Sequence, residues 1–377
     1  MTELSRFGNG TCTKMLNMPV DFDHNDVMAR VPFILQIRGR PARINGTIAM
    51  ETMQALNILL SDMAAHHFGA EIARTLGSTP FRLLSPGDAS SADAHIAFVS
   101  RDVTGLSTKY ELMPETRHFH DVLRGAQDLR WVHAHSAGVD RPIFMDMLQR
   151  GVQVTSSSGA NARTVAHSAL AGLLALARRL QLMSEAQREH VWRPLVLNCA
   201  PRDLAGQTAV IVGYGAIGQH LARLLDALDM SVIVVRREAQ GKGFIDFSML
   251  DDALPRADWL VLACPLTSQT TKLIGARRLA LLSKQAHLIN VARGEVVIEA
   301  DLIAALRNGT LAGAYLDVFE HEPLNSASAL WDMPNVMLTP HMAGQSDSHY
   351  AAVGRIWLDN LARWHRGEPL LNLARWH

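Results

Sequence analysis

A glycine-rich turn between an apolar strand and a helix restricts most strongly how this chain can fold. The sequence Gly213-Tyr214-Gly215-Ala216-Ile217-Gly218 directly follows the apolar run 208–212. The first glycine of such a turn permits a tight bend, the second lets the backbone approach a pyrophosphate, and the third lets helix and strand pack closely. Unpaired N–H groups at the helix start attract phosphate. The pattern predicts a dinucleotide-binding βαβ unit, against the alternative of a glycine-rich turn in a non-binding α/β fold.

Strands and helices alternate on both sides of this turn, which predicts parallel α/β sheets. The first series has strands predicted at 55–60, 81–84, 94–99, 131–134 and 152–155, with helices such as 63–76, 118–126 and 141–150. A long helix at 162–184 leads to a second series of strands at 208–212, 232–235, 259–263, 287–290, 314–316 and 336–338, and a last helix covers 347–364. The chain of 377 residues then contains two doubly wound domains, since a domain has about 150 residues.

The domain boundaries follow from this alternation. We expect a cofactor domain at 157–344 and a discontinuous substrate domain at 53–156 and 345–377. Residues 1–52 are polar, broken by prolines and left unassigned, with one strand expected at 31–37. Either they are a decorating arm, or the native start is Met50 or Met53.

Composition excludes several classes of protein. Lys+Arg and Asp+Glu both number 36, and this zero formal net charge argues against a nucleic-acid or anionic-membrane binder. No run approaches the roughly 18 apolar residues of a membrane helix, and the N-terminus lacks the pattern of a signal peptide. Cys12, Cys199 and Cys264 lie far apart, so we expect neither a disulfide framework nor a metal site, and a cytoplasmic location.

Two arginines follow the strand predicted at 232–235. Arg236 and Arg237 stand where an acidic residue would bind the adenosine ribose hydroxyls and repel a 2′-phosphate. A guanidinium matches phosphate with a planar fork of donors. The pair predicts NADP(H) in preference to NAD(H). The alternative is that both arginines are solvated charges and the site accepts either cofactor.

Three more polar side chains come shortly after predicted strands: Arg293, Glu322 and His341. In open α/β sheets the ligand crevice lies beyond the carboxyl ends of the strands, so such loops can converge. Reduction of a 2-oxo acid needs a cation for the carboxylate, an imidazolium as proton donor and a carboxylate to orient it. By position alone each residue is more often structural, and Glu320 and Asp317 compete with Glu322.

The chain resembles the D-isomer-specific 2-hydroxyacid dehydrogenase family over about residues 53–371. The match is carried by the segments DLAGQTAVIVGYGAIGQ, CPLTSQTTKLIG, LINVARGEVV, LAGAYLDVFEHEPL and NVMLTPHMAG. The resemblance implies a Rossmann cofactor domain with a flavodoxin-like substrate domain. It implies that Arg293 binds the substrate carboxylate, that Glu322, rather than Glu320, pairs with the histidine, and that His341 is the acid/base.

The resemblance also implies further contacts. The loop Ser136, Ala137, Gly138 and Val139 would cradle the carboxylate with its N–H groups, the alternative being a simple turn. Cys264 is expected to pack rather than react. The cofactor would contact the glycine-rich motif together with Pro265, Thr267, Ala292, Asp317 and Gly344. A homodimer built largely on the cofactor domain is implied, with the apolar helix 162–182 as a contributor.

The expected activity is hydride transfer between NADP(H) and a small 2-oxo acid or D-2-hydroxy acid. The members that the sequence resembles most are glyoxylate/hydroxypyruvate reductases. One alternative is a non-catalytic, dinucleotide-sensing protein similar to the corepressors that resemble this family. Another is an NAD-preferring, D-lactate-type dehydrogenase. A formate dehydrogenase is not expected, because the acid partner is Glu322 rather than a glutamine.

Overall fold

A computed structural model describes residues 55–239, 241 and 243–374. The strand predicted at 31–37 and the alternative starts at Met50 and Met53 lie outside these residues. The described part of the chain falls within a single compact unit, and none of its helices is both long and apolar enough to cross a bilayer.

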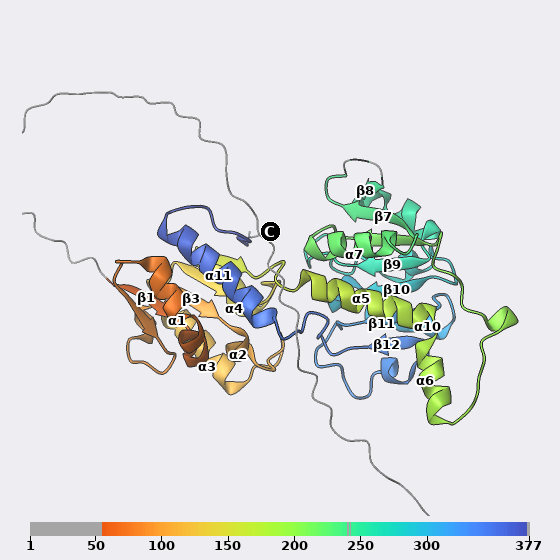
Figure 1. Cartoon of the computed structure of the whole chain (residues 1–377), viewed down its shortest axis with the longest axis horizontal. Helices are drawn as coiled ribbons and strands as arrows, with labels where there is room; N and C mark the ends of the chain where they lie inside the picture. Colours follow the sequence, from red (N-terminus) through yellow and green to blue (C-terminus); the bar gives the residue numbers. More distant parts are fainter. Residues whose placement is uncertain (1–54, 240, 242, 375–377) are drawn as a thin grey trace, which may run out of the picture. The chain divides into compact units, whose positions relative to one another are not determined.

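The first sheet has five parallel strands in the order β2-β1-β3-β4-β5 (Figure 1). All were predicted, and their bounds are β1 Leu56–Leu59, β2 Phe81–Leu84, β3 Ile96–Val99, β4 Trp131–Ala134 and β5 Gln153–Ser156. β3 and β4 are buried throughout, as expected for parallel strands covered on both faces.

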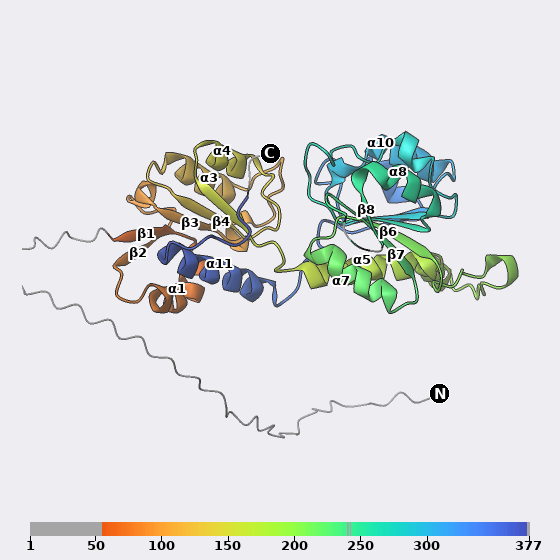
Figure 2. The ribbon, with the colours of Figure 1, turned by 90° about the horizontal axis from the view of Figure 1, so that it is seen from above.

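Helices cover both faces of this sheet (Figure 2). One face packs against α1 Asp62–Leu76 and α11 His349–His365, and the other against α3 Pro114–Gly125 and α4 Pro142–Gln149. The Ser61 side chain caps α1 by accepting from Ala64 N, while α3 and α4 begin with proline, which suits a first helical turn. The short α2 Arg101–Thr104 follows β3 directly.

The second sheet has seven parallel strands in the order β12-β11-β10-β9-β6-β7-β8. Their bounds are β6 Thr208–Val212, β7 Ser231–Arg236, β8 Phe244–Asp246, β9 Trp259–Leu262, β10 His287–Asn290, β11 Gly313–Leu316 and β12 Val336–Leu338. The order runs outward from β6 in both directions, so this sheet is doubly wound, as predicted. The edge strand β8 was not predicted, because its three residues are only half-buried and form no apolar run.

Helices also cover both faces of the second sheet. α5 Ala162–Ala177 and α7 Ala216–Asp226 share one apolar core with β6 and β9–β11. The opposite core includes residues of α8 Leu250–Ala253, α9 Ala276–Leu279 and α10 Glu299–Arg307. β6 ends at Val212 and α7 begins at Ala216, so the glycine-rich motif joins a strand to a helix, as predicted.

The prediction of one long helix at 162–184 was wrong. α5 ends at Ala177, and a separate helix, α6 Leu180–Arg188, begins after Arg179. Arg179 has a φ of 53°, a left-handed conformation that costs an L-residue about 1–2 kcal/mol and interrupts the helical ladder. The apolar run stops at Arg178 and Arg179, but Leu180 and Leu182 follow closely, so two arginines alone did not indicate a helix end.

The C-terminal helix α11 packs on the first sheet although it lies almost 200 residues beyond β5. Trp357 of α11 is 0% exposed and stacks on Phe98 of β3, with ring centroids 4.9 Å apart. Leu373 bridges to Thr155, and Ala374 N donates to Val154 O of β5. These contacts agree with a substrate domain that includes the C-terminal segment, although its boundaries stay a prediction.

We expect Trp357→Ala to lower the free energy of unfolding by about 3–5 kcal/mol, because it opens a cavity between α11 and β3. Trp357→Phe should cost clearly less, since it retains a stacking ring and removes an indole N–H that has no partner among the described residues. Denaturant unfolding measures both. The exposed Trp331 provides the control Trp331→Ala; equal losses for Trp357→Ala and Trp331→Ala would contradict the buried position of Trp357.

Candidate active site

His341 and Glu322 form a close pair beyond the carboxyl ends of β12 and β11. His341 Nδ1 lies 2.7 Å from Glu322 Oε2, and Glu322 also accepts from Phe319 N at 3.1 Å. Burial alone would raise the pKa of Glu322, but the hydrogen bond and charge of His341 lower it below its usual value. The other ring nitrogen of His341, Nε2, has no partner among the described residues, and the side chain is 49% exposed. The competing residue Glu320 instead contacts the backbone at Glu299.

A buried carboxylate shapes the loop that carries His341. Asp317 Oδ1 accepts from Thr339 Oγ1 at 2.7 Å, Met342 N at 2.8 Å and Ala343 N at 3.0 Å. The backbone oxygen of Asp317 accepts from His341 N at 2.8 Å. Burial raises the pKa of Asp317, and His341 has a φ of 49°. Asp317 therefore lies beneath the loop, and its carboxylate is hydrogen-bonded to that loop. Its predicted contact with the cofactor stays a prediction.

Arg293 follows β10, and its guanidinium is held by the protein on three nitrogens. Nη1 donates to Ala292 O at 2.7 Å, while Nε and Nη2 each lie 3.3 Å from Asp140 Oδ1. A guanidinium has five N–H donors, so two remain for a ligand. Burial would raise the pKa of Asp140, but Arg293 and Lys109 lower it, which keeps the carboxylate charged.

The loop 136–139 lies against Arg293. A Cβ atom at Gly138 would collide with the Arg293 guanidinium, so only glycine permits this approach. Ser136 Oγ donates to Gly138 O at 2.6 Å and stiffens the loop. Ser136 and Ala137 line the same pocket as Arg293, while Val139 packs on the core of the first sheet. The structure thus brings together the loop and the arginine that the sequence predicted to share a carboxylate.

One pocket of about 300 Å³ contains these groups. Arg293, Glu322 and His341 line it, as do side chains that the sequence analysis missed: Arg101, Lys109, Tyr110, His135, Arg141, Asn161 and His349. His135 and Arg101 follow β4 and β3 closely, so the strand-end rule used for Arg293 could have found them. Lys109 and Tyr110 lie in a loop without a motif, and His349 begins a helix distant in sequence.

The glycine-rich motif has the geometry that a bound pyrophosphate requires. Gly213 has a φ of 104°, and a Cβ there would collide with the backbone at Ala263. A Cβ at Gly218 would collide with Gly213 O, whereas nothing lies within 4 Å of a Cβ at Gly215. Gly213 and Gly218 therefore permit close packing, and Gly215 leaves the start of α7 open. Unpaired N–H groups there suit the phosphates of a dinucleotide.

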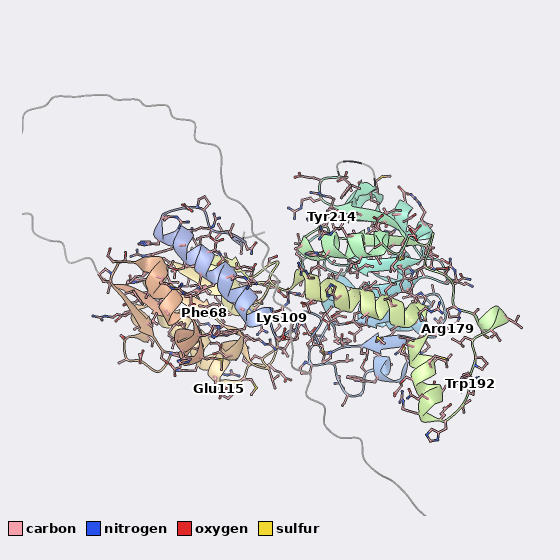
Figure 3. All side chains as sticks on the ribbon, in the orientation of Figure 1. Phe68, Lys109, Glu115, Arg179, Trp192 and Tyr214 are labelled. Carbon is pink, nitrogen blue, oxygen red and sulfur yellow. The ribbon has the colours of Figure 1, made fainter. Side chains whose placement is uncertain are left out.

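The two arginines lie at the predicted strand end. Arg236 is the last residue of β7, and its guanidinium carbon lies 5.9 Å from the Phe244 ring centroid. Tyr214, labelled in Figure 3, packs edge-on against the same Phe244 ring, with ring centroids 4.9 Å apart. Neither Arg236 nor Arg237 has an ion-pair partner in the part of the chain that the structure describes.

The remaining predicted cofactor contacts lie in two places. Thr267 N donates to Thr270 Oγ1, which in turn donates to Pro265 O, so this loop is a self-contained turn. Ile217 and Gly344 line the pocket that contains His341. Cys264 is buried, and burial raises the pKa of its thiol to about 12, which agrees with packing rather than reactivity.

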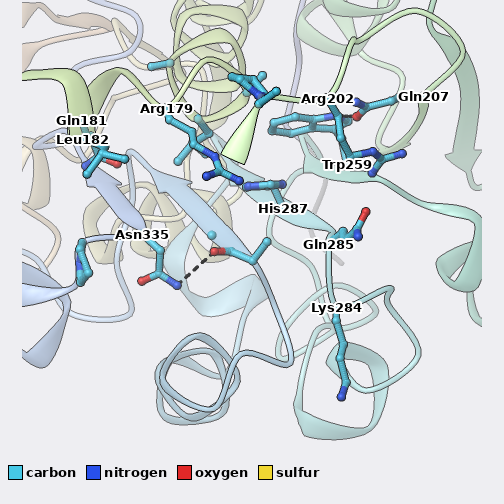
Figure 4. A pocket seen from close by; sticks show the side chains of 18 residues that line it. Arg179, Gln181, Leu182, Arg202, Gln207, Trp259, Lys284, Gln285, His287 and Asn335 are labelled. Atoms are coloured by element: carbon cyan, nitrogen blue, oxygen red, sulfur yellow. Dashed lines mark hydrogen bonds between the residues drawn. The ribbon is translucent and has the colours of Figure 1, made fainter. Parts of the chain in front are cut away.

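A second pocket, of about 540 Å³, lies away from these groups (Figure 4). It is lined by residues at the amino ends of β9 and β10 and by Arg179, which points towards His287. It contains none of the predicted site residues. Within the described residues, no group of three or more His, Cys, Asp or Glu side chains could hold a metal ion.

Comparisons with known proteins agree with this arrangement. Residues 170–343 match the family model "D-isomer specific 2-hydroxyacid dehydrogenase, NAD binding domain". A glyoxylate reductase of Pyrococcus furiosus is 33% identical over 277 residues, which are 71% of this chain and 81% of that protein. The chain belongs to the D-isomer-specific 2-hydroxyacid dehydrogenase family.

Solved structures are similar over most of the chain. A family member from Xanthobacter autotrophicus Py2, in complex with NADPH and MES, has a TM-score of 0.67 at 30% identity, covering 85% of this chain and 98% of that one. An NADPH-dependent glyoxylate/hydroxypyruvate reductase from Sinorhizobium meliloti, in complex with NADP and sulfate, has a TM-score of 0.67 at 27% identity with the same coverage. The predicted fold class, a Rossmann domain with a second α/β domain, is confirmed.

Proposed function

We propose that this dehydrogenase uses NADP(H) to reduce a small 2-oxo acid of the glyoxylate or hydroxypyruvate type to its D-2-hydroxy acid. The observation that carries the proposal is the 2.7 Å pair of His341 and Glu322 in one pocket with Arg293. The relatives also support it. The protein of Pyrococcus furiosus is a glyoxylate reductase, and that of Sinorhizobium meliloti is a glyoxylate/hydroxypyruvate reductase.

Each residue of this set has a chemical task in the proposal. When bound, the nicotinamide supplies the hydride that reduces C2. Arg293 holds the substrate carboxylate with its two free N–H donors, next to the backbone of loop 136–139. His341 Nε2 donates the proton to the oxygen that becomes the hydroxyl. Glu322, hydrogen-bonded at Nδ1, fixes the orientation of the imidazole so that Nε2 faces the substrate.

The same division of tasks extends to the predicted domains. Residues 157–344 would bind the cofactor, and 53–156 with 345–377 the substrate. We also propose a cytoplasmic location, for which the support is the sequence alone. A non-catalytic sensor would bind the dinucleotide without using His341, so turnover separates it from the enzyme.

We expect the full-length protein to oxidise NADPH, followed by the loss of its absorbance, in the presence of glyoxylate or hydroxypyruvate, with pyruvate and phenylpyruvate completing the panel. His341→Ala should lower kcat at least about 100-fold, because a general acid contributes 10²–10⁴-fold, while the dissociation constant of NADPH changes little.

His321→Ala is the control for loss of an imidazole, since His321 directly precedes Glu322 and packs near Tyr110 but does not line the pocket. NADPH binding without consumption in the wild type would support the sensor instead. Loss of NADPH binding in His341→Ala would make His341 a structural residue.

The choice of NADP(H) is proposed from the arginines at the end of β7. Both guanidinium groups are free of carboxylate partners in the described chain, so their donors are available for a 2′-phosphate. The solved relatives from Xanthobacter autotrophicus and Sinorhizobium meliloti are complexes with NADPH and NADP, respectively, which supports this choice.

We expect Arg236→Ala/Arg237→Ala to raise the dissociation constant of NADPH about 10- to 100-fold, because charge-assisted hydrogen bonds to phosphate are lost. The constant for NADH, which lacks this phosphate, should change less than about threefold. Isothermal titration of both cofactors measures the difference, and exposed Arg256→Ala is the control for net charge. Equal weakening of NADH and NADPH would refute a specific role at the 2′-phosphate.

A homodimer is proposed from the segment that contains α6 and the loop after it. Leu180, Val191, Val196 and Leu197 expose large apolar side chains there, and Trp192 is 95% exposed. Figure 3 shows Trp192 in this loop, away from the body of the second sheet. Contiguous exposed apolar surface of this kind marks an interaction site. A second copy of the chain is the occupant that the family resemblance implies.

We expect the purified protein to have the mass of a dimer in sedimentation velocity, and Trp192→Asp to shift it towards monomer by placing a charge in the interface. Leu106→Asp, which introduces a charge at another exposed apolar residue, is the matched control and should remain dimeric. A monomeric wild type would contradict this proposal without affecting the reductase.

A further inference from the structure

One cation of the active-site pocket has neither an ion-pair partner nor a hydrogen-bond partner among the described residues. Arg101 begins α2 and lines the pocket, but its side chain makes no hydrogen bond or ion pair with any described residue. The other pocket cations are engaged. Lys109 pairs with Glu295 at 2.8 Å and with Asp140 at 3.3 Å, and Arg141 donates to the carbonyl oxygens of residues 107 and 108.

The acidic side chains that line the pocket already have ion-pair or hydrogen-bond partners as well. Asp140 and Glu295 contact Lys109, Glu322 contacts His341, and Asp317 is held by the loop beneath His341. Asp102 follows Arg101 in sequence, but it neither lines the pocket nor pairs with the guanidinium. A half-buried guanidinium without a counter-charge is costly, which favours an anion supplied by a ligand.

Two histidines, His135 and His349, line the same pocket as Arg101 and are close enough to feel its charge. The Nδ1 atoms of His135 and His349 are buried without a hydrogen-bond partner in the described structure. His135 is only 7% exposed; burial and then the charges of Arg101 and Arg141 lower its pKa to about 3. Burial and Arg101 also lower the pKa of His349. Both rings are therefore neutral near pH 7, and a neutral imidazole has one N–H that can donate to an oxygen.

We propose that Arg101, His135 and His349 form a subsite for a second anionic group of the substrate. The preferred substrates are then 2-oxo acids with a distal carboxylate or phosphate, rather than glyoxylate itself. This inference rests on the proposed function, in which Arg293 holds the carboxylate next to the reacting carbonyl. The distal group is unchanged in the reaction, and hydride and proton are added to the 2-oxo group as before.

The test uses substrate pairs that differ in the distal charge. 2-Oxobutyrate is compared with oxaloacetate, 2-oxopentanoate with 2-oxoglutarate, and hydroxypyruvate with its 3-phosphate. For at least one pair we expect kcat/KM with NADPH to be about 10- to 100-fold higher for the member with the distal anionic group. This is the effect of a charge-assisted hydrogen bond. The pair with the largest ratio identifies the distal group as carboxylate or phosphate and sets its distance from C2.

The variant Arg101→Met should lower this ratio of kcat/KM values about 10-fold or more, mainly by raising KM for the substrate with the distal anionic group. Arg101→Lys should retain part of the ratio. Exposed Arg117→Met removes the same charge away from the pocket and should keep the wild-type ratio. His349→Gln provides a second variant on the same subsite if Arg101→Met folds poorly, and it should also lower the ratio.

The outcomes separate the two proposals. Reduction of the uncharged substrates with ratios of one or less would overturn the subsite and leave the reductase intact. An equal loss for both members of each pair in Arg101→Met would also overturn it, because Arg101 would then serve the shared carboxylate. If no 2-oxo acid is reduced, the proposed function fails, and the substrate class fails with it.

Discussion

The active-site arrangement depends on one buried carboxylate. Asp317 accepts hydrogen bonds from Thr339, Met342 and Ala343 and so fixes the loop that follows β12. Within this loop His341 has a left-handed backbone, a conformation that costs a non-glycine residue about 1–3 kcal/mol. Hydrogen bonds to a charged acceptor contribute about 1.5–3 kcal/mol each, enough to offset that cost. The result is an imidazole within 2.7 Å of Glu322, with Nε2 left free.

Neighbouring parallel strands explain why distant residues meet. β10, β11 and β12 are adjacent and in register, so the loops after them, which carry Arg293, Glu322 and His341, leave the sheet at one edge. The first sheet contributes its own strand-end loops, with Asp140 against Arg293 and Lys109 against Glu295. These ion pairs balance most of the charge in the pocket. Arg141 contacts only backbone carbonyl oxygens, and the Arg101 guanidinium has no partner at all among the described residues. This free guanidinium is the basis for the proposed second anion subsite.

Much of the fold could be predicted because burial on both faces makes parallel strands into short apolar runs. The strands from β1 to β7 and from β9 to β12 were predicted on that signal. β8 was missed because an edge strand needs no such run. The break between α5 and α6 was missed because the left-handed backbone of Arg179 sets it, and two arginines within a helix are too common to predict such a conformation. For the site, the motif residues were found, whereas Lys109, Tyr110 and His349 carry no local pattern.

By itself the sequence determined the strand–turn–helix unit, the positions of Arg293, Glu322 and His341 at strand ends, and the membership of a family. These are local properties, since residue type and spacing decide a strand, a glycine turn or a cap. Only the tertiary structure decided that Gly138 lies against Arg293, and that the Arg101 guanidinium has no partner among the described residues. Such facts depend on which loops meet in space and which charges neutralise one another, and neither is encoded within a single segment.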